Sequence, residues 1–421
     1  MSAALYRLYN AIWYPALPFA MLAGGGDSHE RLGRVRPGEI PAGDGPRIWF
    51  HASSVGEVEA LSAIAQALIR EVDGASAIVT TMTESGREAA RRRIPDAAVH
   101  RLAPFDHPSR VRNFIAAMRP KLMVITETEI WPGYFIEARR AGARIAIVNG
   151  RVSERSFERY QWLRPLLAEA LQLADLVLAQ TADDARRYRD LGAPRRRVVV
   201  TGNTKFDLAR LAPAPAIRPA LQRYAAGAPL IVAGSTAPGE EPIVIEAWRA
   251  IAARWPRTRL AIAPRHLKRL AEIEALLRDG GLPFVKASTL PESEDHSARI
   301  LLLDTMGELR ALYAHAAIAF VGGSLVPGRG GQSLAEPAAA GVPVLFGPYH
   351  ESQRQIAAAL LDGDGGQVVK DADDLGKVCA ALLAGDARRV RAGQAARRSL
   401  DLLGGAVGFS IPMLKALIAA G

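Results

Sequence analysis

Short apolar runs alternate with amphipathic helical stretches from Arg47 onward, and this alternation constrains the fold most strongly. The runs are nearly unbroken and rich in β-branched residues, which is typical of strands buried on both faces of a parallel sheet. The stretches between them are about 10 to 18 residues long, as crossovers between parallel strands require. The strands predicted in the first half of the chain are Ile48–His51, Ala77–Thr81, Leu122–Thr126, Ile145–Asn149, Leu176–Ala179 and Val198–Thr201.

The alternation breaks at residues 208–229, where four prolines stand in an Ala-rich setting. Such a stretch is typical of a connection between domains. The alternation then restarts, with predicted strands at Leu230–Ala233, Leu260–Ala263, Ile300–Leu303, Ile318–Val321 and Val344–Phe346. The predicted helices of this half begin near Glu240, His266, Thr305, Ser333 and Glu351.

The pattern therefore predicts an α/β protein with two doubly wound units in tandem. We expect a first domain at 27–207, a linker at 208–229 and a second domain at 230–421. Ligands of such sheets bind beyond the carboxyl ends of the strands. We therefore expect a small-molecule site in a cleft where the two domains face each other.

Composition excludes several classes of protein. Hydrophobic residues make up 49% and charged residues 23% of the chain, which excludes disorder over most of its length. A mean hydropathy of +0.05 excludes a polytopic membrane protein. Since Cys379 is the single cysteine, the chain has no intrachain disulfide and no cysteine-based zinc or iron–sulfur site.

The formal charge of +10 favours anionic partners such as phosphates, nucleic acid or an acidic lipid surface. The Arg runs at Arg91–Arg93 and Arg195–Arg197 fall on expected helix ends and turns, where solvated charge is usual. No nucleic-acid-binding motif accompanies them, so we expect no nucleic-acid partner.

Residues 1–26 form an aromatic segment with no acidic residue and one base, Arg7. Amphipathic rings at this density suit a membrane interface. Pro15 and Pro18 interrupt the apolar run, which disfavours both a cleaved signal peptide and a full transmembrane helix. We expect an interfacial anchor, helical up to about Tyr14; the alternative is a helix docked on the protein's own core. The aromatic residues are Tyr6, Tyr9, Trp13, Tyr14 and Phe19.

Two common phosphate signatures are absent from the sequence. It contains no G-x-x-x-x-G-K-[ST], which excludes a P-loop NTPase, and no G-x-G-x-x-G after the first strand of either unit. The Gly-rich stretch Gly322–Ser333 instead leads into a predicted helix, and such a loop is a candidate anion site. A surface loop without function is the alternative.

Glu57 is the strongest single candidate for a catalytic residue, because it lies one turn into the helix that follows the first strand. We expect the helix dipole to keep its carboxylate ionised, ready to accept a proton from a sugar hydroxyl. The alternative is a capping box formed by Ser54 and Glu57, in which the Glu only closes the helix start. The same spacing recurs at Ser85–Glu88, Thr305–Glu308 and Ser333–Glu336.

Other charged residues also follow predicted strands. Glu127 and Glu129 are candidates for ordering hydroxyls or cations, and Lys205 for meeting a leaving phosphate. Further strand-end cations are Arg151, Arg155 and Arg265. The histidines show no metal-ligand spacing, and the D-x-D at Asp362–Asp364 is typical of turn chemistry, so we expect no metal.

Eight motifs together resemble the 3-deoxy-D-manno-octulosonic acid (Kdo) transferases, which are GT-B glycosyltransferases of lipopolysaccharide synthesis. The likeness runs in order and spacing from the N-terminal segment to about Gln353. The motifs are HASSVGEVEA, TETEIWP, NGRVSERS, GNTKFD, AGSTAPGEE, APRH, LDTMGEL and GGSLVPGRGGQSLAEPAAAGVPVLFGP.

The resemblance implies CMP-Kdo as donor and the lipid A precursor lipid IVA as acceptor, at the cytoplasmic face of the inner membrane. It implies a metal-independent reaction, and we expect no cofactor and no obligate protein partner. Glu57 matches the family's proton acceptor, and Glu127 and Lys205 match residues that stabilise the transition state. Ser53, Ser54, Arg151 and Arg155 are our candidates for acceptor or anion contacts. The CMP-binding segments match Pro264, Arg265, Met306, Gly307, Glu308, Ser333, Leu334, Ala335 and Glu336.

One departure concerns the donor side, where the family usually reads Gly-Gly-His-Asn before Leu-Glu-Pro. Here the segment is Gly331-Gln332-Ser333, and the run that follows is Ala335-Glu336-Pro337. The alternatives are another GT-B glycosyltransferase with a different nucleotide sugar and a lipid-linked acceptor, a sugar-nucleotide epimerase of the same fold, and a basic binding protein for nucleic acid or anionic lipid.

Overall fold

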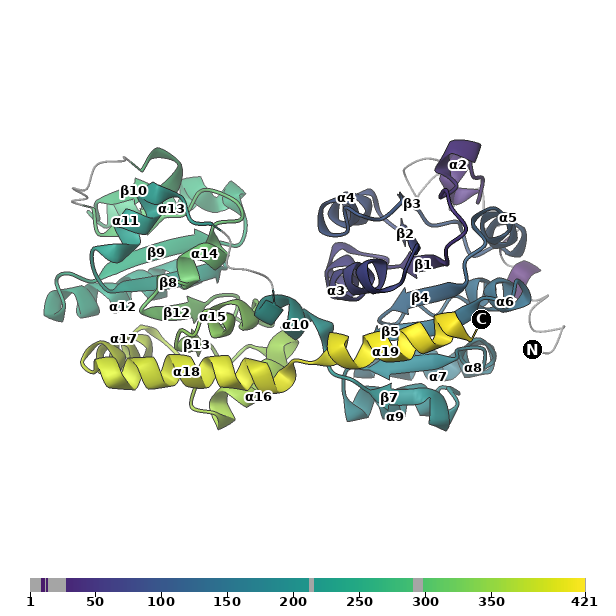
Figure 1. Ribbon diagram of the computed structural model, residues 1–421. Helices are drawn as coiled ribbons and strands as arrows, with labels where there is room; N and C mark the ends of the chain where they lie inside the picture. The colour runs from purple at the N-terminus through teal and green to yellow at the C-terminus, as the bar shows by residue number, and fades with distance from the viewer. Residues whose placement is uncertain (1–8, 12, 14–27, 212–215, 291–297, 421) are drawn as a thin grey trace. The chain divides into compact units, whose positions relative to one another are not determined.

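The computed structural model describes residues 9–11, 13, 28–211, 216–290 and 298–420 (Figure 1). The chain divides into two compact units. Unit 1 comprises Met1–Leu208 and Gly404–Gly421, and unit 2 comprises Ala209–Leu403. Each unit contains one 7-stranded sheet in which all pairings are parallel, so the predicted pair of doubly wound α/β domains is confirmed.

The sheet of unit 1 has the order β3-β2-β1-β4-β5-β6-β7. Its strands are β1 (Arg47–His51), β2 (Ser76–Thr81), β3 (Val99–Leu102), β4 (Leu122–Thr126), β5 (Arg144–Gly150), β6 (Leu176–Ala179) and β7 (Val198–Val200). Its helices are α2 (Ser28–Arg31), α3 (Val55–Glu71), α4 (Glu84–Arg93), α5 (Pro108–Met118), α6 (Pro132–Arg140), α7 (Glu154–Trp162), α8 (Arg164–Leu171), α9 (Ala182–Asp190), α10 (Thr204–Leu211) and α19 (Ala406–Ala419).

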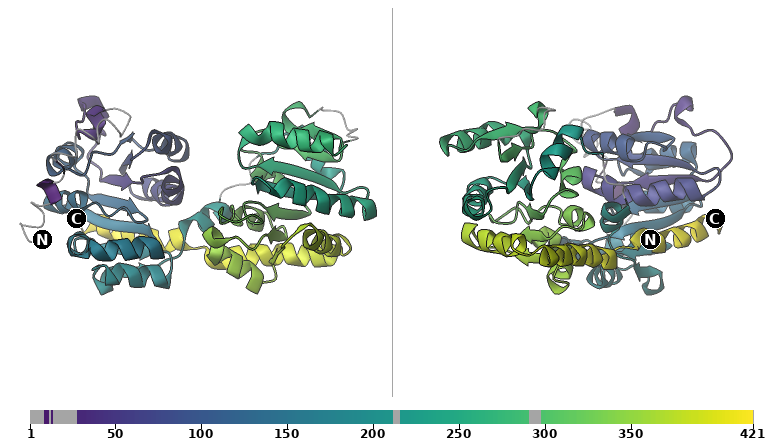
Figure 2. Two further views of the ribbon diagram at one scale, coloured as in Figure 1. Left: turned by 180° about the vertical axis from the view of Figure 1, so that it is seen from behind. Right: turned by 60° about the vertical axis from the view of Figure 1, so that its left-hand side comes forward.

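Helices cover both faces of this sheet, which explains why its central strands are apolar along their whole length (Figure 1). On one face α5, α6, α8 and α9 enclose a core around Trp49 and Phe114. On the other face α3, α4 and α19 enclose a second core around Phe50. Figure 2 shows the yellow C-terminal helices from two further directions.

The sheet of unit 2 has the order β10-β11-β9-β8-β12-β13-β14. Its strands are β8 (Leu230–Thr236), β9 (Arg259–Pro264), β10 (Phe284–Lys286), β11 (Ile300–Leu302), β12 (Ile318–Val321), β13 (Val344–Phe346) and β14 (Gly366–Val368). Its α-helices are α11 (Pro219–Ala226), α12 (Glu240–Arg254), α13 (Leu270–Asp279), α14 (Leu309–Tyr313), α15 (Ala335–Ala339), α16 (Arg354–Asp362), α17 (Ala372–Leu383) and α18 (Asp386–Leu403).

All eleven strands predicted from the apolar runs are confirmed, within a few residues at their ends. The three strands without a prediction are β3, β10 and β14, and each lies at an edge of its sheet. Edge strands have one paired side only, so short and partly polar segments such as Phe284–Lys286 suffice there. The Asp362–Asp364 segment is the end of α16 and the turn that follows, which confirms the predicted turn, with Asp364 at φ 58°.

The domain boundaries differ from the predicted ones in two places. Residues 208–229 are not a free linker, because α11 packs Leu221 and Tyr224 into a core of unit 2. The second domain is predicted at 230–421, but Gly404–Gly421 belong to unit 1. There Val407, Ile411 and Leu414 of α19 pack beside α3. The chain therefore passes between the units twice.

The predicted N-terminal anchor, 1–26, lies outside the described residues except for residues 9–11 and 13. Of these, Tyr9 donates a hydrogen bond of 2.5 Å to Asp106, and the Trp13 ring lies 6.3 Å from that of Phe105. These two side chains are thus docked on unit 1. In the part of the chain that the structure describes, one helical stretch is long and apolar enough to cross a membrane, Asp386–Ala419, which is α18 with α19.

Candidate active site

The strand order of unit 1 reverses between β1 and β4, which are neighbours in the sheet. In doubly wound sheets ligands bind at this switch point, beyond the carboxyl ends of the strands. The segment after β1 leads into α3 and carries Glu57, and the segment after β4 carries Glu127. The topology therefore places the two predicted catalytic carboxylates on adjacent strand ends.

Glu57 is held by the first turn of α3. Its backbone N–H donates to Oγ of the N-cap residue Ser54 at 3.4 Å, and that hydroxyl donates to Oε1 at 3.1 Å. The N–H of Ser53 donates to Oε2 at 2.8 Å. Ser54 is thus confirmed as the side-chain cap of α3, but the capping box is incomplete, since the Glu57 carboxylate accepts from the N–H of Ser53 rather than that of Ser54. These contacts fix the direction of the carboxylate.

The capping boxes expected at the three other Ser/Thr-x-x-Glu segments do not form. The α4 helix is capped by Thr83, and α14 and α15 begin at Leu309 and Ala335 with no side-chain cap. Of the three segments, Thr305–Glu308 shares with Ser54–Glu57 the hydroxyl-to-carboxylate contact but not the capped helix start.

The electrostatics of Glu57 differ from the expectation of a simple ionised carboxylate. Burial, and then the charges of the nearby carboxylates Glu129 and Glu127, together raise its pKa to about 7. The hydrogen bonds from Ser53 and Ser54 act in the opposite direction and do not outweigh the burial. A pKa near 7 suits a general base, since the group is both deprotonated and basic at neutral pH.

Glu127 has an unusual backbone conformation, with φ 55°. Its N–H donates to the carbonyl of Val148 at 3.0 Å, and its carbonyl accepts a hydrogen bond from the Tyr188 hydroxyl at 2.5 Å. A left-handed backbone costs energy for a residue with a Cβ, so the surroundings of Glu127 must hold it in this conformation.

Lys205 meets Glu127 from the start of α10, where its Nζ lies 3.2 Å from Oε1. Asn149, at the end of β5, joins the two segments: its Nδ2 donates to Glu127 Oε1 at 3.4 Å, and its Oδ1 accepts from Thr204 N at 3.0 Å. Asn149 was not among the predicted site residues, although its strand-end position and its φ of 51° mark it in the structure.

Glu129 and His51 add a second group of contacts beside Glu57. Glu129 accepts a hydrogen bond from the Trp131 indole N–H at 2.6 Å, and its Oε2 lies 4.0 Å from His51 Nε2. Burial, and then the Arg31 charge, lower the pKa of His51 to about 3, so its imidazole is neutral. His51 is the last residue of β1, and its strand-end position was the signal for it.

The structure leaves several predicted acceptor-side residues accessible. Arg151 and Arg155 are exposed, before and within α7. The hydroxyl of Ser54 is used by Glu57, whereas the Ser53 hydroxyl has no hydrogen-bond partner among the described residues. Trp162 and Leu163, at the end of α7, expose 89% and 51% of their surface.

The predicted donor residues lie in unit 2. Pro264 ends β9 and is buried, while Arg265 beside it is exposed. Met306 is 77% exposed, and Gly307 has φ 86°. The Glu308 carboxylate is engaged by Arg218 at 2.5 and 3.1 Å and by the Thr305 hydroxyl.

The Gly-rich segment differs from the predicted loop and helix. The helix expected near Ser333 begins at Ala335 and spans five residues, α15. Leu334 and Ala335 are buried, whereas Ser333 is exposed and Glu336 is half-buried. At the start of the candidate anion loop, the backbone N–H groups of Gly323, Ser324 and Leu325 all donate to Glu240.

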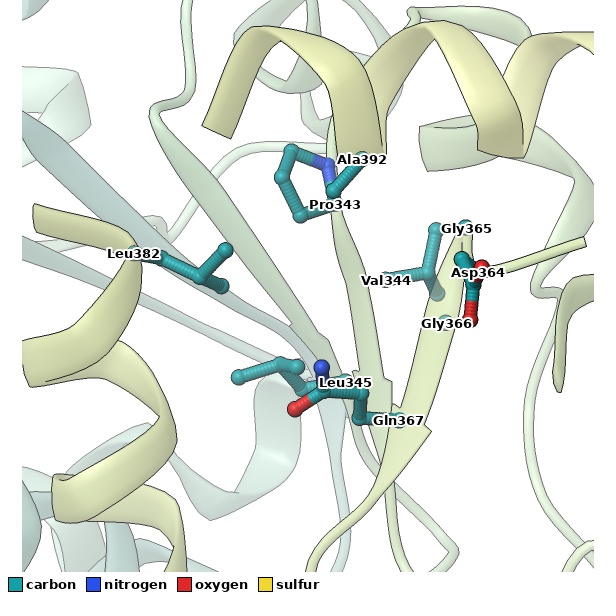
Figure 3. A pocket seen from close by; sticks show the side chains of 9 residues that line it. All are labelled: Pro343, Val344, Leu345, Asp364, Gly365, Gly366, Gln367, Leu382 and Ala392. Carbon is teal, nitrogen blue, oxygen red and sulfur yellow. The ribbon is translucent and has the colours of Figure 1, made fainter. Parts of the chain in front are cut away.

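A hollow in unit 2 lies away from all these residues (Figure 3). It holds about 10 Å³, room for about one water molecule, between the starts of β13 and β14 and the helices α17 and α18. Among the described residues, no group of three or more His, Cys, Asp or Glu is placed to hold a metal ion.

Residues 27–208 match the family model described as 3-Deoxy-D-manno-octulosonic-acid transferase (kdotransferase). The chain is 32% identical to the 3-deoxy-D-manno-octulosonic acid transferase of Haemophilus influenzae over 92% of this chain and 90% of that protein. It is 35% identical to the transferase of the same description from Bordetella pertussis over 94% of each chain.

Solved structures show the same fold at low sequence identity. A putative UDP-N-acetylglucosamine 2-epimerase from Listeria monocytogenes superposes with a TM-score of 0.63 at 16% identity, over 90% of this chain and 98% of that one. The UDP-GlcNAc 2-epimerase of Neisseria meningitidis gives 0.59 at 13% identity, over 89% and 100%. These likenesses concern the fold alone.

Proposed function

Because the chain belongs to the Kdo transferase family, glycosyltransferases of lipopolysaccharide biosynthesis, we propose that it moves Kdo from CMP-Kdo to lipid IVA. The proposed reaction is a single displacement with inversion that needs no metal and no cofactor. The proposed place of action is the cytoplasmic face of the inner membrane.

The observation that carries this proposal is the group of Glu57, Glu127 and Lys205 at the switch point of unit 1. Glu57 takes the proton of the attacking sugar hydroxyl while the oxygen bonds to the anomeric carbon of Kdo. The bond from that carbon to the CMP phosphate breaks, and its electron pair leaves with CMP. Lys205, fixed by Glu127, stabilises the charge that develops in this step.

On the donor side we propose that unit 2 binds CMP. The exposed Met306 and the backbone at Gly307 lie beside the cytosine, and the exposed Arg265 supplies a cation for the anionic donor. Glu308 orders this segment through Arg218 rather than through the nucleotide. Ser333, Leu334, Ala335 and Glu336 complete the proposed site, with Glu336 at the ribose.

On the acceptor side we propose that unit 1 meets the membrane and its amphiphilic substrate. The exposed Trp162 and Leu163 stand close in sequence to the exposed Arg151 and Arg155. Exposed aromatic and aliphatic side chains with neighbouring cations suit an anionic lipid surface. The aromatic N-terminal segment supports the same location.

The experiment is transfer to a defined acceptor. Detergent-solubilised protein is incubated with lipid IVA and freshly generated CMP-Kdo, and the mass of the lipid product is measured by mass spectrometry. The proposal predicts a gain of one or more Kdo residues, and the mass also counts the additions. Unchanged lipid IVA, with intact donor and folded protein, would contradict the substrate assignment.

A second candidate is a GT-B enzyme with another nucleotide sugar and a lipid-linked acceptor. The observation in its favour is Gln332 and Ser333 where the family usually has His and Asn. Competition by free nucleotides separates the two candidates. CMP should inhibit the Kdo transferase and UDP should not, while the reverse order would favour the second candidate.

A further inference from the structure

Unit 2 has its own switch point, between β8 and β12, which are neighbours in the sheet. In unit 1 the corresponding place holds Glu57 and Glu127. In unit 2 it holds Glu240, the first residue of α12, whose side chain is fully buried. A buried carboxylate requires strong hydrogen-bond donors, and the β12 loop supplies most of them.

Four backbone N–H groups donate to the Glu240 carboxylate. Its Oε1 accepts from Ser324 and Leu325, both at 2.8 Å. Its Oε2 accepts from Gly323 at 2.7 Å and from Ala237 at 2.8 Å. Three of the four donors are thus successive residues of the Gly-rich segment after β12, an arrangement of amides that ordinarily binds an anion.

The glycines of this segment are explained by Glu240. A Cβ at Gly322 would lie 2.6 Å from Glu240 Oε2 and 2.5 Å from the Cα of Thr236, so no side chain fits. Gly323 has φ 68°, which turns its N–H toward the same carboxylate. The Gly-Gly pair therefore allows the close approach of a protein carboxylate.

The same segment controls the position of the predicted donor residues. The N–H of Gly331 donates to the Gly323 carbonyl at 2.8 Å, and that of Gln332 donates to the Gly322 carbonyl at 3.1 Å. Ser333 to Glu336 follow directly. The Ser324 hydroxyl is also engaged, because it donates to Val321 at 2.6 Å and accepts from Gly347 at 2.8 Å.

We infer that Glu240 is a positioning residue of the donor site: its carboxylate occupies the amide nest at Gly323–Leu325 and fixes the loop as far as Ser333. Because these amides are occupied by Glu240, other groups of unit 2 must bind the phosphate and carboxylate of the donor. The inference rests on the proposed function, in which this loop binds CMP-Kdo.

The test compares Glu240→Gln with Glu241→Gln in the full chain. Glutamine has the same shape, but its amide nitrogen cannot accept the hydrogen bonds of two of the four donors. Glu241 is the matched control, since it is the next residue, is equally buried, and pairs with Arg269 at 2.7 and 2.9 Å instead of with the loop.

Three readouts separate a positioning role from a structural one. In Glu240→Gln we expect faster hydrogen exchange at the amides of residues 323–325, weaker CMP binding by calorimetry, and a KM for CMP-Kdo raised by about 10- to 100-fold with a smaller change in kcat. Glu241→Gln should lower Tm but leave the loop amides, CMP binding and this KM unchanged.

The outcomes are distinct. Wild-type protein that does not bind CMP would overturn the proposed donor, and with it the inference. Wild-type binding together with unchanged exchange, binding and KM in Glu240→Gln would overturn the inference alone. Should Glu240→Gln fail to fold, Glu240→Asp keeps the charge but shortens its reach, and the same three readouts apply to it.

Discussion

Lys205 Nζ lies 3.2 Å from Glu127 Oε1, although 78 positions separate the two residues. The two side chains are 35% and 16% exposed, so the pair is accessible to a substrate. Asn149 links the two segments that carry the pair: its side chain donates to Glu127 and accepts from the N–H of Thr204, the first residue of α10. A cation held in this way is fixed before a substrate arrives, which is the condition for stabilising charge in a transition state.

Replacing Lys205 with methionine should lower kcat by about 100- to 1,000-fold, because the cation that meets the leaving phosphate is lost. The fold should survive, since a partly exposed ion pair contributes at most about 1 kcal/mol. Initial rates of Kdo transfer measure the effect. Lys268→Met, at an exposed lysine of unit 2, is the control. A Lys205 variant within twofold of wild type would refute the role.

Replacing Glu129 with glutamine should move the acidic limb of the pH–rate profile to lower pH. Burial raises the pKa of Glu57 first, and the Glu129 charge raises it next. Without that charge the Glu57 pKa falls, so the base is deprotonated at lower pH. Glu127 also raises the pKa of Glu57, and it is paired with Lys205. The variant therefore keeps Glu127, so that any shift of the profile is due to the loss of the Glu129 charge. A profile that stays in place would show that Glu129 does not act on the base.

Two variants of Asn149 measure separately the contribution of its side-chain hydrogen bonds and that of its backbone conformation. Asn149→Ala loses two side-chain hydrogen bonds, at about 1 kcal/mol each, and keeps a Cβ at φ 51°, a backbone region that Ala tolerates less well than Asn. Asn149→Gly loses the same hydrogen bonds without the backbone cost. We expect Tm to fall in the order wild type, Gly, Ala, and kcat to fall in both variants. Equal Tm values for the two variants would contradict the backbone argument.

Asp207 should anchor α19 to unit 1. Its Oδ1 accepts from Gly405 N at 2.6 Å and its Oδ2 from Val407 N at 2.9 Å, which caps the helix. Asp207→Ala should cost about 0.5–2 kcal/mol and speed hydrogen exchange in α19. Asp371→Ala, which removes the cap of α17, is the matched control and should leave α19 unchanged. Unaltered protection of α19 in Asp207→Ala would show that the apolar packing alone holds it.

The central strands could be predicted because both of their faces are buried, which leaves a continuous apolar run in the sequence. The edge strands β3 and β14 carry no such run, because they are short and include the partly exposed polar residues His100 and Gln367. The return of α19 to unit 1 depends on packing of Ile411 and Leu414 beside α3, more than three hundred residues earlier. No local pattern carries that information.

The residues proposed as catalytic could be predicted only from their positions at strand ends and from the family resemblance. Glu57 and Lys205 follow strands, so the topology points to them. Asn149 acts through contacts with two other segments, and Glu240 through amides 83 to 85 positions away. The expected anion site on Gly322–Ser333 stays a prediction for the rest of the loop, since Glu240 occupies the amides of Gly323, Ser324 and Leu325.

The pH dependence of kcat/KM in wild type and in Glu57→Gln tests the central claim most directly. With Glu57 as the base at a pKa of about 7, wild-type kcat/KM should rise with pH and level off above neutrality. Glu57→Gln should be about 100- to 10,000-fold slower and lack this limb. A folded Glu57→Gln variant with near-wild-type rates, or with the same limb, would contradict the account.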